Sequence, residues 1–391
     1  MPSLPTTFVT PDLSQWEVHA ERGFLPDPDP LLELPPEYAA WERMNRELPG
    51  LLAAGSAAML RSVSKLPTLE LAGLQTASMH NRAMVLLSVL AHAFVWADPQ
   101  QPRTLLPAAI ALPLGTLAAQ LGRPPLCTHA TTVLHNWRRL DPSGPIELGN
   151  VATLAGFFGG LDEAWFFLVT LGVEARGAPA VVTSLQLQAA VVALDVGAAT
   201  AALEAMHATL LGMTAVLRRM YERCAPFVFF NRLRPFLAGW KDEPLLPDGL
   251  IYEGISPQPQ QYFGASAAQS ALFPLFDEVL GIAHDPGTAG GYLRQMRNYM
   301  LGGHRRLLEY VAAGPSVRQW LQRLPESGSL RAAYNLCVGE LGELRTLHMR
   351  IAAEYIVAQA RAGAEARGTG STTVIPFLKS VRDETAASAA A

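Results

Sequence analysis

The strongest constraint on the fold is a run of apolar residues that alternate by four and three positions between residues 192 and 220. On a helix this spacing draws one continuous apolar stripe about 43 Å long, the length of a domain. The stripe consists of Val192, Val196, Ala199, Leu203, Met206, Leu210, Met213, Leu217 and Met220. A heptad of this kind also fits a coiled-coil dimer, but Ala and Met at the seam and the presence of other long apolar helices favour an intramolecular bundle.

Other segments share the helical period, whereas strand patterns are hard to find. Helices are predicted over residues 38–60, 71–96, 128–140, 162–173, 266–281 and 334–357. Neither a sustained alternation of period two nor an Asn-Gly hairpin is present in the sequence. We therefore predict an all-α fold.

Proline and glycine mark the places where the chain changes character. Residues 1–36 hold eight prolines, which predicts an extended arm on the surface instead of a long helix. The stretch DPSGPIELGN, residues 141–150, is rich in turn formers and predicts a boundary. We expect a smaller N-terminal domain over residues 1–150, including the arm, and a large helical-bundle domain over residues 151–391.

Composition excludes several classes of protein. Half of the 391 residues are hydrophobic, only 16% are charged and the net charge is −4, so no nucleic-acid partner is expected. Two uncharged stretches, residues 104–122 and 177–194, contain Pro and Gln and predict buried helices better than a membrane span. The three cysteines lack paired spacing, and no signal peptide is visible, which predicts free thiols in a soluble, cytoplasmic protein.

His348 is the most informative polar residue, because it continues the apolar stripe of the helix predicted over residues 334–357. An imidazole in such a stripe is often a hydrogen-bonded core residue. No Cys or His stands four residues away to complete a zinc site. A single imidazole facing a large apolar interior also suits the proximal ligand of a haem iron, so core residue and haem ligand both stay open. Arg345, one turn earlier, could contact a haem propionate or form a salt bridge with Asp277.

Two further segments could bind a ligand. Arg234 follows the pair Phe229-Phe230, so a guanidinium could hold a carboxylate while the rings stack on a flat substrate; an ordinary aromatic core is the alternative. GTGSTT, residues 368–373, has no preceding strand and no Lys, which disfavours a nucleotide loop and favours a loop that closes over a ligand. There is no GxSxG motif, so a hydrolase is a poor fit.

The chain resembles the indoleamine 2,3-dioxygenase family, all-helical haem enzymes that open the indole ring of tryptophan. The similarity covers most of the chain, in the family's order and spacing. It is carried by RGFLPDPDPL, LGRPPL, VLHNW, FFNRLRPFLAGW, DGLIYEG, GASAAQSALFPLFDEVLGI, YMLGGHRRLLEYV, AYNLCVGELGELRTLHMRIAAEYI and GTGSTTVIPFLKSVRDET.

The resemblance implies a set of site residues. On the haem side it implies His348 as the proximal iron ligand and Arg345 as the propionate partner, supported by Asp277. Around the substrate it implies an aromatic wall, a carboxylate partner, a turn near the haem edge and the substrate amine, and a closing loop. These are Phe166, Phe167, Phe229 and Phe230; Arg234; Ala265 and Ser266; and Thr369.

The sequence departs from the pattern of the animal enzymes at five pocket positions. Thr170 stands in place of Ser, Ala265 in place of Gly, and His129 in place of Tyr. Thr132 replaces a pocket Cys, and Ser371 replaces a loop Gly. One methyl group in a pocket changes discrimination between substrates by roughly 1–3 kcal/mol, so these changes bear on the preferred substrate and leave the haem side alone.

The activity implied by the resemblance is cleavage of the indole C2–C3 bond of L-tryptophan by O2, giving N-formylkynurenine. It further implies one haem b per chain, enclosed by the large domain, and an electron donor that keeps the iron ferrous. A family relative acting on a different indole in secondary metabolism is the alternative that the pocket changes suggest. A non-catalytic helical binding protein is the alternative suggested by the heptad.

Overall fold

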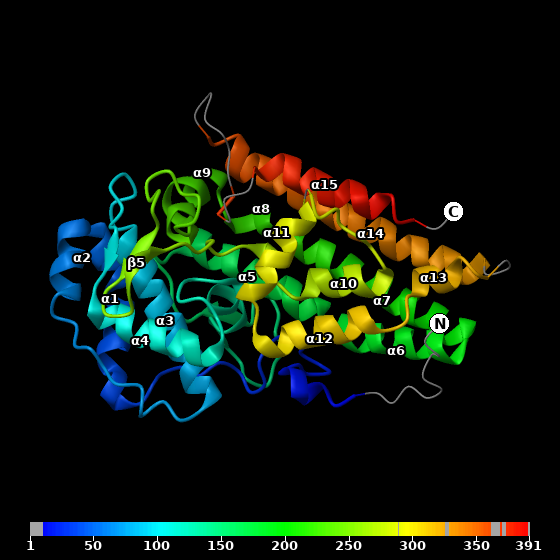
Figure 1. The fold of residues 1–391 in the computed structure, drawn as a ribbon, viewed down its shortest axis with the longest axis horizontal. Helices are drawn as coiled ribbons and strands as arrows, with labels where there is room; N and C mark the ends of the chain where they lie inside the picture. The colour runs from blue at the N-terminus through cyan, green and yellow to red at the C-terminus, as the bar shows by residue number, and fades with distance from the viewer. Residues whose placement is uncertain (1–10, 288, 325–327, 361–367, 370–372, 390–391) are drawn as a thin grey trace.

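Helices make up most of the chain, which confirms the predicted all-α class (Figure 1). The computed structural model describes residues 11–287, 289–324, 328–360, 368–369 and 373–389. The α-helices are α1 Ala39–Ala53, α2 Ser56–Val63, α3 Ala77–Val95, α4 Ala108–Leu121, α5 Leu161–Gly177, α6 Pro179–Ala193, α7 Val196–Arg218, α8 Met220–Arg223, α9 Pro226–Val228, α10 Leu272–Leu280, α11 Ala289–Met296, α12 Gly302–Ala313, α13 Val317–Leu321, α14 Gly328–Ala352 and α15 Val374–Ala386.

Short 3-10 and π turns connect or extend these helices. The 3-10 turns are η1 Leu13–Trp16, η2 Pro36–Tyr38, η5 Arg234–Leu237, η6 Ala267–Gln269 and η7 Arg297–Tyr299, and the π turns are η3 Ala130–Leu134, η4 Phe229–Leu233 and η8 Ala353–Val357. All three π turns come from segments that carry or adjoin residues predicted for the site. Single π turns of this kind are frequent at functional sites.

Within the described residues, five short strands form two small sheets. They are β1 Leu105–Leu106, β2 Trp137–Arg139, β3 Val151–Thr153, β4 Leu250–Tyr252 and β5 Ser256–Gln260. β1 is parallel to β4, β4 is antiparallel to β5, and β2 is antiparallel to β3. The helix predicted over residues 128–140 is therefore wrong in its second half. There, pairing of β2 with a segment distant in sequence overrides the local helical pattern.

The long stripe that begins at Val192 is divided between helices, which corrects the prediction of one continuous helix. Leu194 adopts a left-handed conformation with φ of 56° and ends α6, and the Asp195 side chain caps α7 by accepting from the Ala198 N–H at 2.9 Å. Met220, at the other end of the stripe, lies in α8. α7 packs on α14, α6 and α5, so the stripe is buried within the chain, as expected for a bundle.

The helical pairs α5–α6 and α7–α8 are long and apolar enough to cross a membrane by length and composition. Within this fold the α5–α6 pair is mostly buried, and α7 packs against α5, α6 and α14. Core helices of large helical proteins have the same properties.

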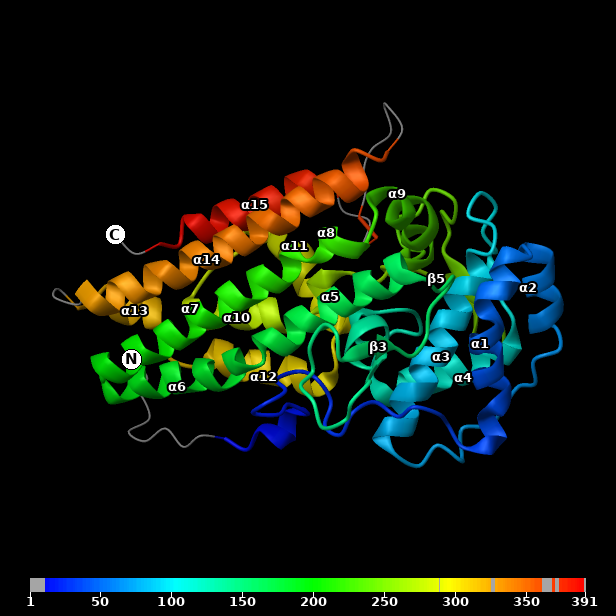
Figure 2. The same ribbon diagram turned by 180° about the vertical axis from the view of Figure 1, so that it is seen from behind.

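The helix predicted over residues 334–357 is present and starts earlier, since α14 begins at Gly328 and η8 continues it to Val357. Its stripe is buried through Cys337, Leu341 and Leu344. α15, which was not among the predicted helices, packs along α14, and Figures 1 and 2 show the two running side by side at one edge of the molecule.

The molecule has two main hydrophobic clusters. One joins α1, α3 and α4 to aromatic residues of α5, η4 and η8, and the other fills the space between α6, α7, α10, α12 and α14. Figure 2 shows α1–α4 at one end of the molecule and the long helices at the other, with α5 between them. The first cluster and the β2–β3 pair both continue across residue 150, and the domain boundary there stays a prediction.

Candidate functional site

A cavity of about 730 Å³ lies where α5, α10, α14 and α15 meet η4, η6 and η8. Its volume is in the range of cofactor and substrate pockets. Most of the residues predicted for the site line it. These are His348, Arg345, Asp277, Phe166, Phe167, Thr170, Phe229, Ala265, Ser266 and Thr369. The structure thus brings together residues that are as far apart in sequence as 166 and 369.

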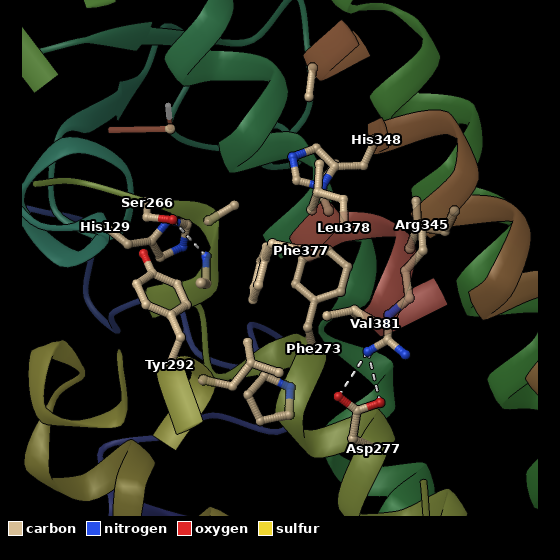
Figure 3. A pocket seen from close by; sticks show the side chains of 18 of the residues that line it. His129, Ser266, Phe273, Asp277, Tyr292, Arg345, His348, Phe377, Leu378 and Val381 are labelled. Atoms are coloured by element: carbon tan, nitrogen blue, oxygen red, sulfur yellow. Dashed lines mark hydrogen bonds and ion pairs between the residues drawn. The ribbon is translucent and has the colours of Figure 1, made fainter. Parts of the chain in front are cut away.

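His348 extends from α14 into this cavity (Figure 3). Among the residues that the structure describes, none forms a hydrogen bond with the imidazole. Burial lowers the pKa of His348, so the ring is neutral and has a nitrogen lone pair to give to a ligand. A core histidine would have a hydrogen-bond partner. The unpartnered ring in an apolar cavity therefore fits a single axial ligand to a haem iron.

The described residues hold no group of three or more His, Cys, Asp or Glu side chains that could bind a metal ion. A structural or catalytic zinc site needs such a group. A cofactor that brings four of its own ligands needs only one protein side chain, and His348 meets that need.

Arg345 lies one turn from His348 at the edge of the cavity and is part of a buried charged network. Its Nη2 donates to both oxygens of Asp277, at 2.7 and 2.8 Å, and its Nη1 donates to the Thr385 hydroxyl of α15. Asp277 also contacts His284 Nε2 at 3.1 Å, and His284 Nδ1 lies 2.6 Å from Glu384. The expected Arg345–Asp277 salt bridge is therefore present, and it links α14, α10 and α15 (Figure 3).

The network shifts the pKa of its members in opposite directions. Burial alone would raise the pKa of Asp277, but the Arg345 charge and the contacts with His284 outweigh burial and lower it. Burial alone would lower the pKa of His284, but its hydrogen bonds to Asp277 and Glu384 raise it. Both shifts favour the charged forms, so this edge of the cavity is ionic.

Aromatic rings form an apolar wall of the cavity. The centre of the Phe166 ring of α5 lies 4.7 Å from the centre of the Phe229 ring of η4 and 5.6 Å from that of Phe167. The ring centres of Phe229 and Tyr355 of η8 are 5.9 Å apart. Thr170 also lines the cavity, and its hydroxyl donates to the Phe166 carbonyl of the same helix at 2.9 Å. Such a wall suits a flat apolar ring.

Ala265 and Ser266 form a turn that is held on both sides. The Thr369 hydroxyl donates to the Ala265 carbonyl at 2.5 Å, and the Ser266 side chain caps η6 by accepting from the Ala268 N–H. A Cβ on the neighbouring Gly264 would lie 2.1 Å from the Leu237 carbonyl, so only glycine permits this close approach of two backbones. Ser371, the fifth departure, lies outside the described residues.

Phe230 and Arg234 are not among the residues that line the cavity. The Arg234 guanidinium lies 5.3 Å from the centre of the Phe230 ring in a cation–π contact. Burial lowers the pKa of Arg234, and Glu243 acts in the opposite direction. The role of Arg234 as a carboxylate partner stays a prediction, and it requires the guanidinium to turn away from Phe230.

Two residues that the sequence did not single out lie at the cavity or directly behind it. Tyr292 of α11 places its hydroxyl near Ser266, and burial raises its pKa (Figure 3). Glu174 of α5 lies behind the cavity wall, where Oε1 is 2.8 Å from His129 Nε2. Glu174 follows Phe166 and Thr170 at helical spacings of eight and four, so the period of α5 could have revealed it. Tyr292 gave no comparable signal.

Comparison with known proteins gives the family of this chain. A family model described as "Indoleamine 2,3-dioxygenase" matches residues 12–388. Indoleamine 2,3-dioxygenase 2 of Homo sapiens is 36% identical over 394 residues, which cover 97% of this chain and 96% of the relative. Indoleamine 2,3-dioxygenase 1 of Rattus norvegicus is 37% identical over 388 residues, which cover 95% of this chain and 94% of the relative. A 6-hydroxytryptophan 2,3-dioxygenase of Fusarium equiseti is 34% identical, covering 95% and 96%. The chain belongs to the indoleamine 2,3-dioxygenase family.

Proposed function

We propose that this protein cleaves the indole C2–C3 bond of L-tryptophan with O2 to give N-formylkynurenine. The observation that carries the proposal is the His348 imidazole, which no described residue hydrogen-bonds, in a cavity that also has an aromatic wall. The names of the relatives support the same reaction class, a dioxygenase acting on indoleamines.

The proposed cofactor is one haem b per chain, which His348 would hold through its imidazole and Arg345 would contact through a propionate. When bound, the haem iron supplies the activation of O2 that an organic side chain lacks. Buried as the salt-bridge partner of Asp277, Arg345 is held in place before a cofactor arrives. An external electron donor keeps the iron in the ferrous state.

The protein's own residues position the substrate and exclude water. The indole ring packs between the Phe166–Phe229 pair and the remaining apolar part of the cavity wall, and this packing fixes the plane of the ring. Ser266 and Thr369 lie where the substrate amine could be held, and Arg234 is the proposed partner of its carboxylate. Because ordered apolar side chains surround the ring, water and side reactions are kept away from it.

A different indole is the second candidate for the substrate. One relative is named a 6-hydroxytryptophan 2,3-dioxygenase, and this chain carries His129, Thr132, Thr170 and Ala265 in its cavity wall. Each of these side chains changes the size or polarity of the space next to the ring.

The test is an optical spectrum of the purified protein, supplied with haem during expression, followed by identification of the product. We expect a Soret band of the ferrous protein that shifts with L-tryptophan and O2, and a product heavier than tryptophan by both atoms of O2. Binding of haem without turnover of L-tryptophan would point to another indole substrate. Absence of the Soret band would favour a helical binding protein without catalytic activity.

We also propose that the protein works in the cytoplasm. Its cysteines Cys127, Cys224 and Cys337 are free and buried, and burial raises the pKa of each thiol to about 12. Thiols of this kind fit a reducing compartment. Fractionation of the source cells, followed by immunoblotting, tests the proposal.

A further inference from the structure

His129 is a cavity-lining histidine whose ring is fixed in place by several contacts. It precedes η3, and its backbone N–H donates to Gln269 Oε1 at 2.9 Å. Its ring Nε2 lies 2.8 Å from Glu174 Oε1, which also accepts from the Ser270 hydroxyl. His129, Glu174 and Ser270 are each at most 3% exposed. The imidazole therefore has one orientation and little freedom to leave it.

The second ring nitrogen of His129, Nδ1, is available to a ligand. A carboxylate accepts hydrogen bonds, so the proton of the contact with Glu174 sits on Nε2. Within the described part of the chain Nδ1 has no hydrogen-bond partner, and it is not among the polar atoms sealed inside the protein. Because His129 lines the cavity and Nδ1 is not sealed inside the protein, we infer that Nδ1 faces the cavity; Figure 3 shows His129 among the lining side chains, beside Ser266.

The two threonine hydroxyls on this wall already donate hydrogen bonds within the protein. The Thr132 hydroxyl donates to the Thr128 carbonyl at 2.9 Å, and the Thr170 hydroxyl donates to the Phe166 carbonyl at 2.9 Å. Val133 and Phe167 complete the wall with apolar atoms. Among the polar side chains of His129, Thr132 and Thr170, Nδ1 of His129 is thus the atom that no described residue hydrogen-bonds, and a plain hydrocarbon edge of the substrate would leave it without a partner.

The ring end of the substrate suits this wall better than the amino-acid end. The substrate's α-carboxylate would face the buried Glu174 charge, which repels it. A hydroxyl group on the ring has no charge and can both donate and accept. It therefore pairs with Nδ1 whether the imidazole is neutral or protonated, whereas a methyl group of similar size can do neither.

We propose that His129, oriented by Glu174, hydrogen-bonds a hydroxyl group on the benzene ring of the indole, so that hydroxylated tryptophans are the preferred substrate class. This specificity rests on the dioxygenase function proposed above. His129 acts on the substrate directly, and Glu174 acts through His129 as a positioning residue.

The experiment compares hydroxytryptophans with methyltryptophans substituted at the same position, at ring positions 4 to 7, using the haem-loaded protein. Affinity is measured by calorimetry and specificity by kcat/KM. At one or more positions we expect the hydroxyl compound to be favoured at least about tenfold in both measurements, as one well-formed hydrogen bond allows. This comparison uses the unmodified protein, so it does not depend on the folding of a variant.

Variants then assign the preference to His129. His129→Phe keeps a ring of similar size but lacks Nδ1, and we expect the hydroxyl-to-methyl ratio to fall to about one. Glu174→Gln should keep part of the ratio, because the amide oxygen can still accept from Nε2. Thr131→Val, in the same turn but outside the cavity lining, is the matched control and should leave the ratio within about twofold, since its hydroxyl is bonded to Thr128 within that turn.

The outcomes separate this inference from the proposed function. If L-tryptophan is cleaved and no hydroxyl compound is favoured, the inference fails and the proposed function stands. A preference for the hydroxyl compound that survives in His129→Phe also overturns the inference, because another group then hydrogen-bonds the hydroxyl of the substrate. An equal loss for L-tryptophan and for the hydroxyl compounds would mean that His129 only shapes the pocket. If no indole is cleaved and no haem binds, the proposed function itself fails.

Discussion

His348 and His129 face the same cavity from two walls and have different surroundings. His348 stands on a long regular helix, and no described residue hydrogen-bonds its ring. His129 stands before a short π turn, with its backbone and its ring both bonded to buried partners. A metal ligand must present one ring nitrogen with a free lone pair to the ion, and a side chain that hydrogen-bonds a substrate must be held in one orientation. The contrast fits the different tasks proposed for these two residues of the same type.

The contrast extends to the residues behind each wall. Behind His348, the contacts of His284 with Asp277 and Glu384 raise its pKa against the effect of burial. Behind His129, burial lowers the pKa of His304 to about 4 and that of His135 to about 3, with the Arg123 charge acting in the same direction. Around His348, the surroundings therefore favour the charged form of His284, whereas behind His129 they favour the neutral forms of His304 and His135.

The largest expected effect comes from removing the His348 imidazole. His348→Ala should lower haem affinity by at least about tenfold and abolish the axial-ligand signature in the optical spectrum. His129→Phe should keep both haem and that signature, because His129 belongs to the other wall. Retained axial ligation in His348→Ala, or its loss in His129→Phe, would reverse the assignment of the two histidines. Circular dichroism checks that both variants fold.

The ionic side should be sensitive to the loss of one partner. Asp277→Ala leaves the Arg345 charge buried without its carboxylate, and we expect the free energy of unfolding to fall by roughly 3–5 kcal/mol. The control is Arg46→Ala, which breaks an exposed pair with Glu33 and should cost about 0.2–1 kcal/mol. Urea unfolding measures both. If both variants lowered the free energy of unfolding equally, the Asp277 network would contribute no more to stability than an exposed ion pair does.

The two sides should respond to opposite ends of the pH range. His135 and His304 have lowered pKa values, so below pH 6.5 the unfolded state takes up their protons first. As the pH falls further, each of the two histidines lowers the free energy of unfolding by about 1.4 kcal/mol per pH unit, until the pH reaches the pKa of that histidine in the folded protein. His284 has a raised pKa, so its contribution is complete below pH 6.5 and is lost as the pH rises through its pKa in the fold.

Urea unfolding across this pH range tests both signs. His304→Gln should reduce the acid slope by about one proton between pH 6 and pH 4, and His284→Gln should flatten the alkaline side alone. If His304→Gln left the acid slope unchanged, His304 would be protonated in the fold.

The smallest effect is expected at the loop that contacts the Ala265–Ser266 turn. Thr369→Val keeps the shape of the side chain and removes the hydrogen bond to the Ala265 carbonyl. We expect a loss of about 0.5–1.5 kcal/mol of substrate binding, seen as a rise in KM of up to about tenfold with little change in kcat. Thr369→Ser should restore the KM. A fall in kcat with constant KM would instead place Thr369 in the chemical step.

The sequence predicted those parts of the fold that depend on local periodicity. The stripe of α14 was visible because Cys337, Leu341 and Leu344 repeat at helical spacing and are all buried. The break at Leu194 was missed, because its left-handed conformation is unusual for a branched side chain and interrupts no apolar spacing. The strand at Trp137 was missed because it exists only through pairing with β3.

The site was predictable in its residues more than in its contacts. A resemblance can place His348 and Phe166 at a pocket, but the contact between His129 and Glu174 joins segments 45 residues apart. Likewise, the placement of Arg234 on Phe230, away from the cavity lining, depends on how η4 and η5 fold. Such contacts follow from tertiary packing, which periodicity and motif spacing do not describe.

The position of α15 in the order of synthesis has a further consequence. Val374, Phe377, Leu378 and Val381 of α15 line the cavity, and Thr385 of the same helix binds Arg345. A ribosome makes these residues after every other part of the cavity wall. The nascent chain therefore lacks this part of the cavity wall until α15 emerges and packs onto α14. A cofactor that bound during translation would contact an incomplete cavity wall. Its stable enclosure requires that α15 has left the ribosomal exit tunnel.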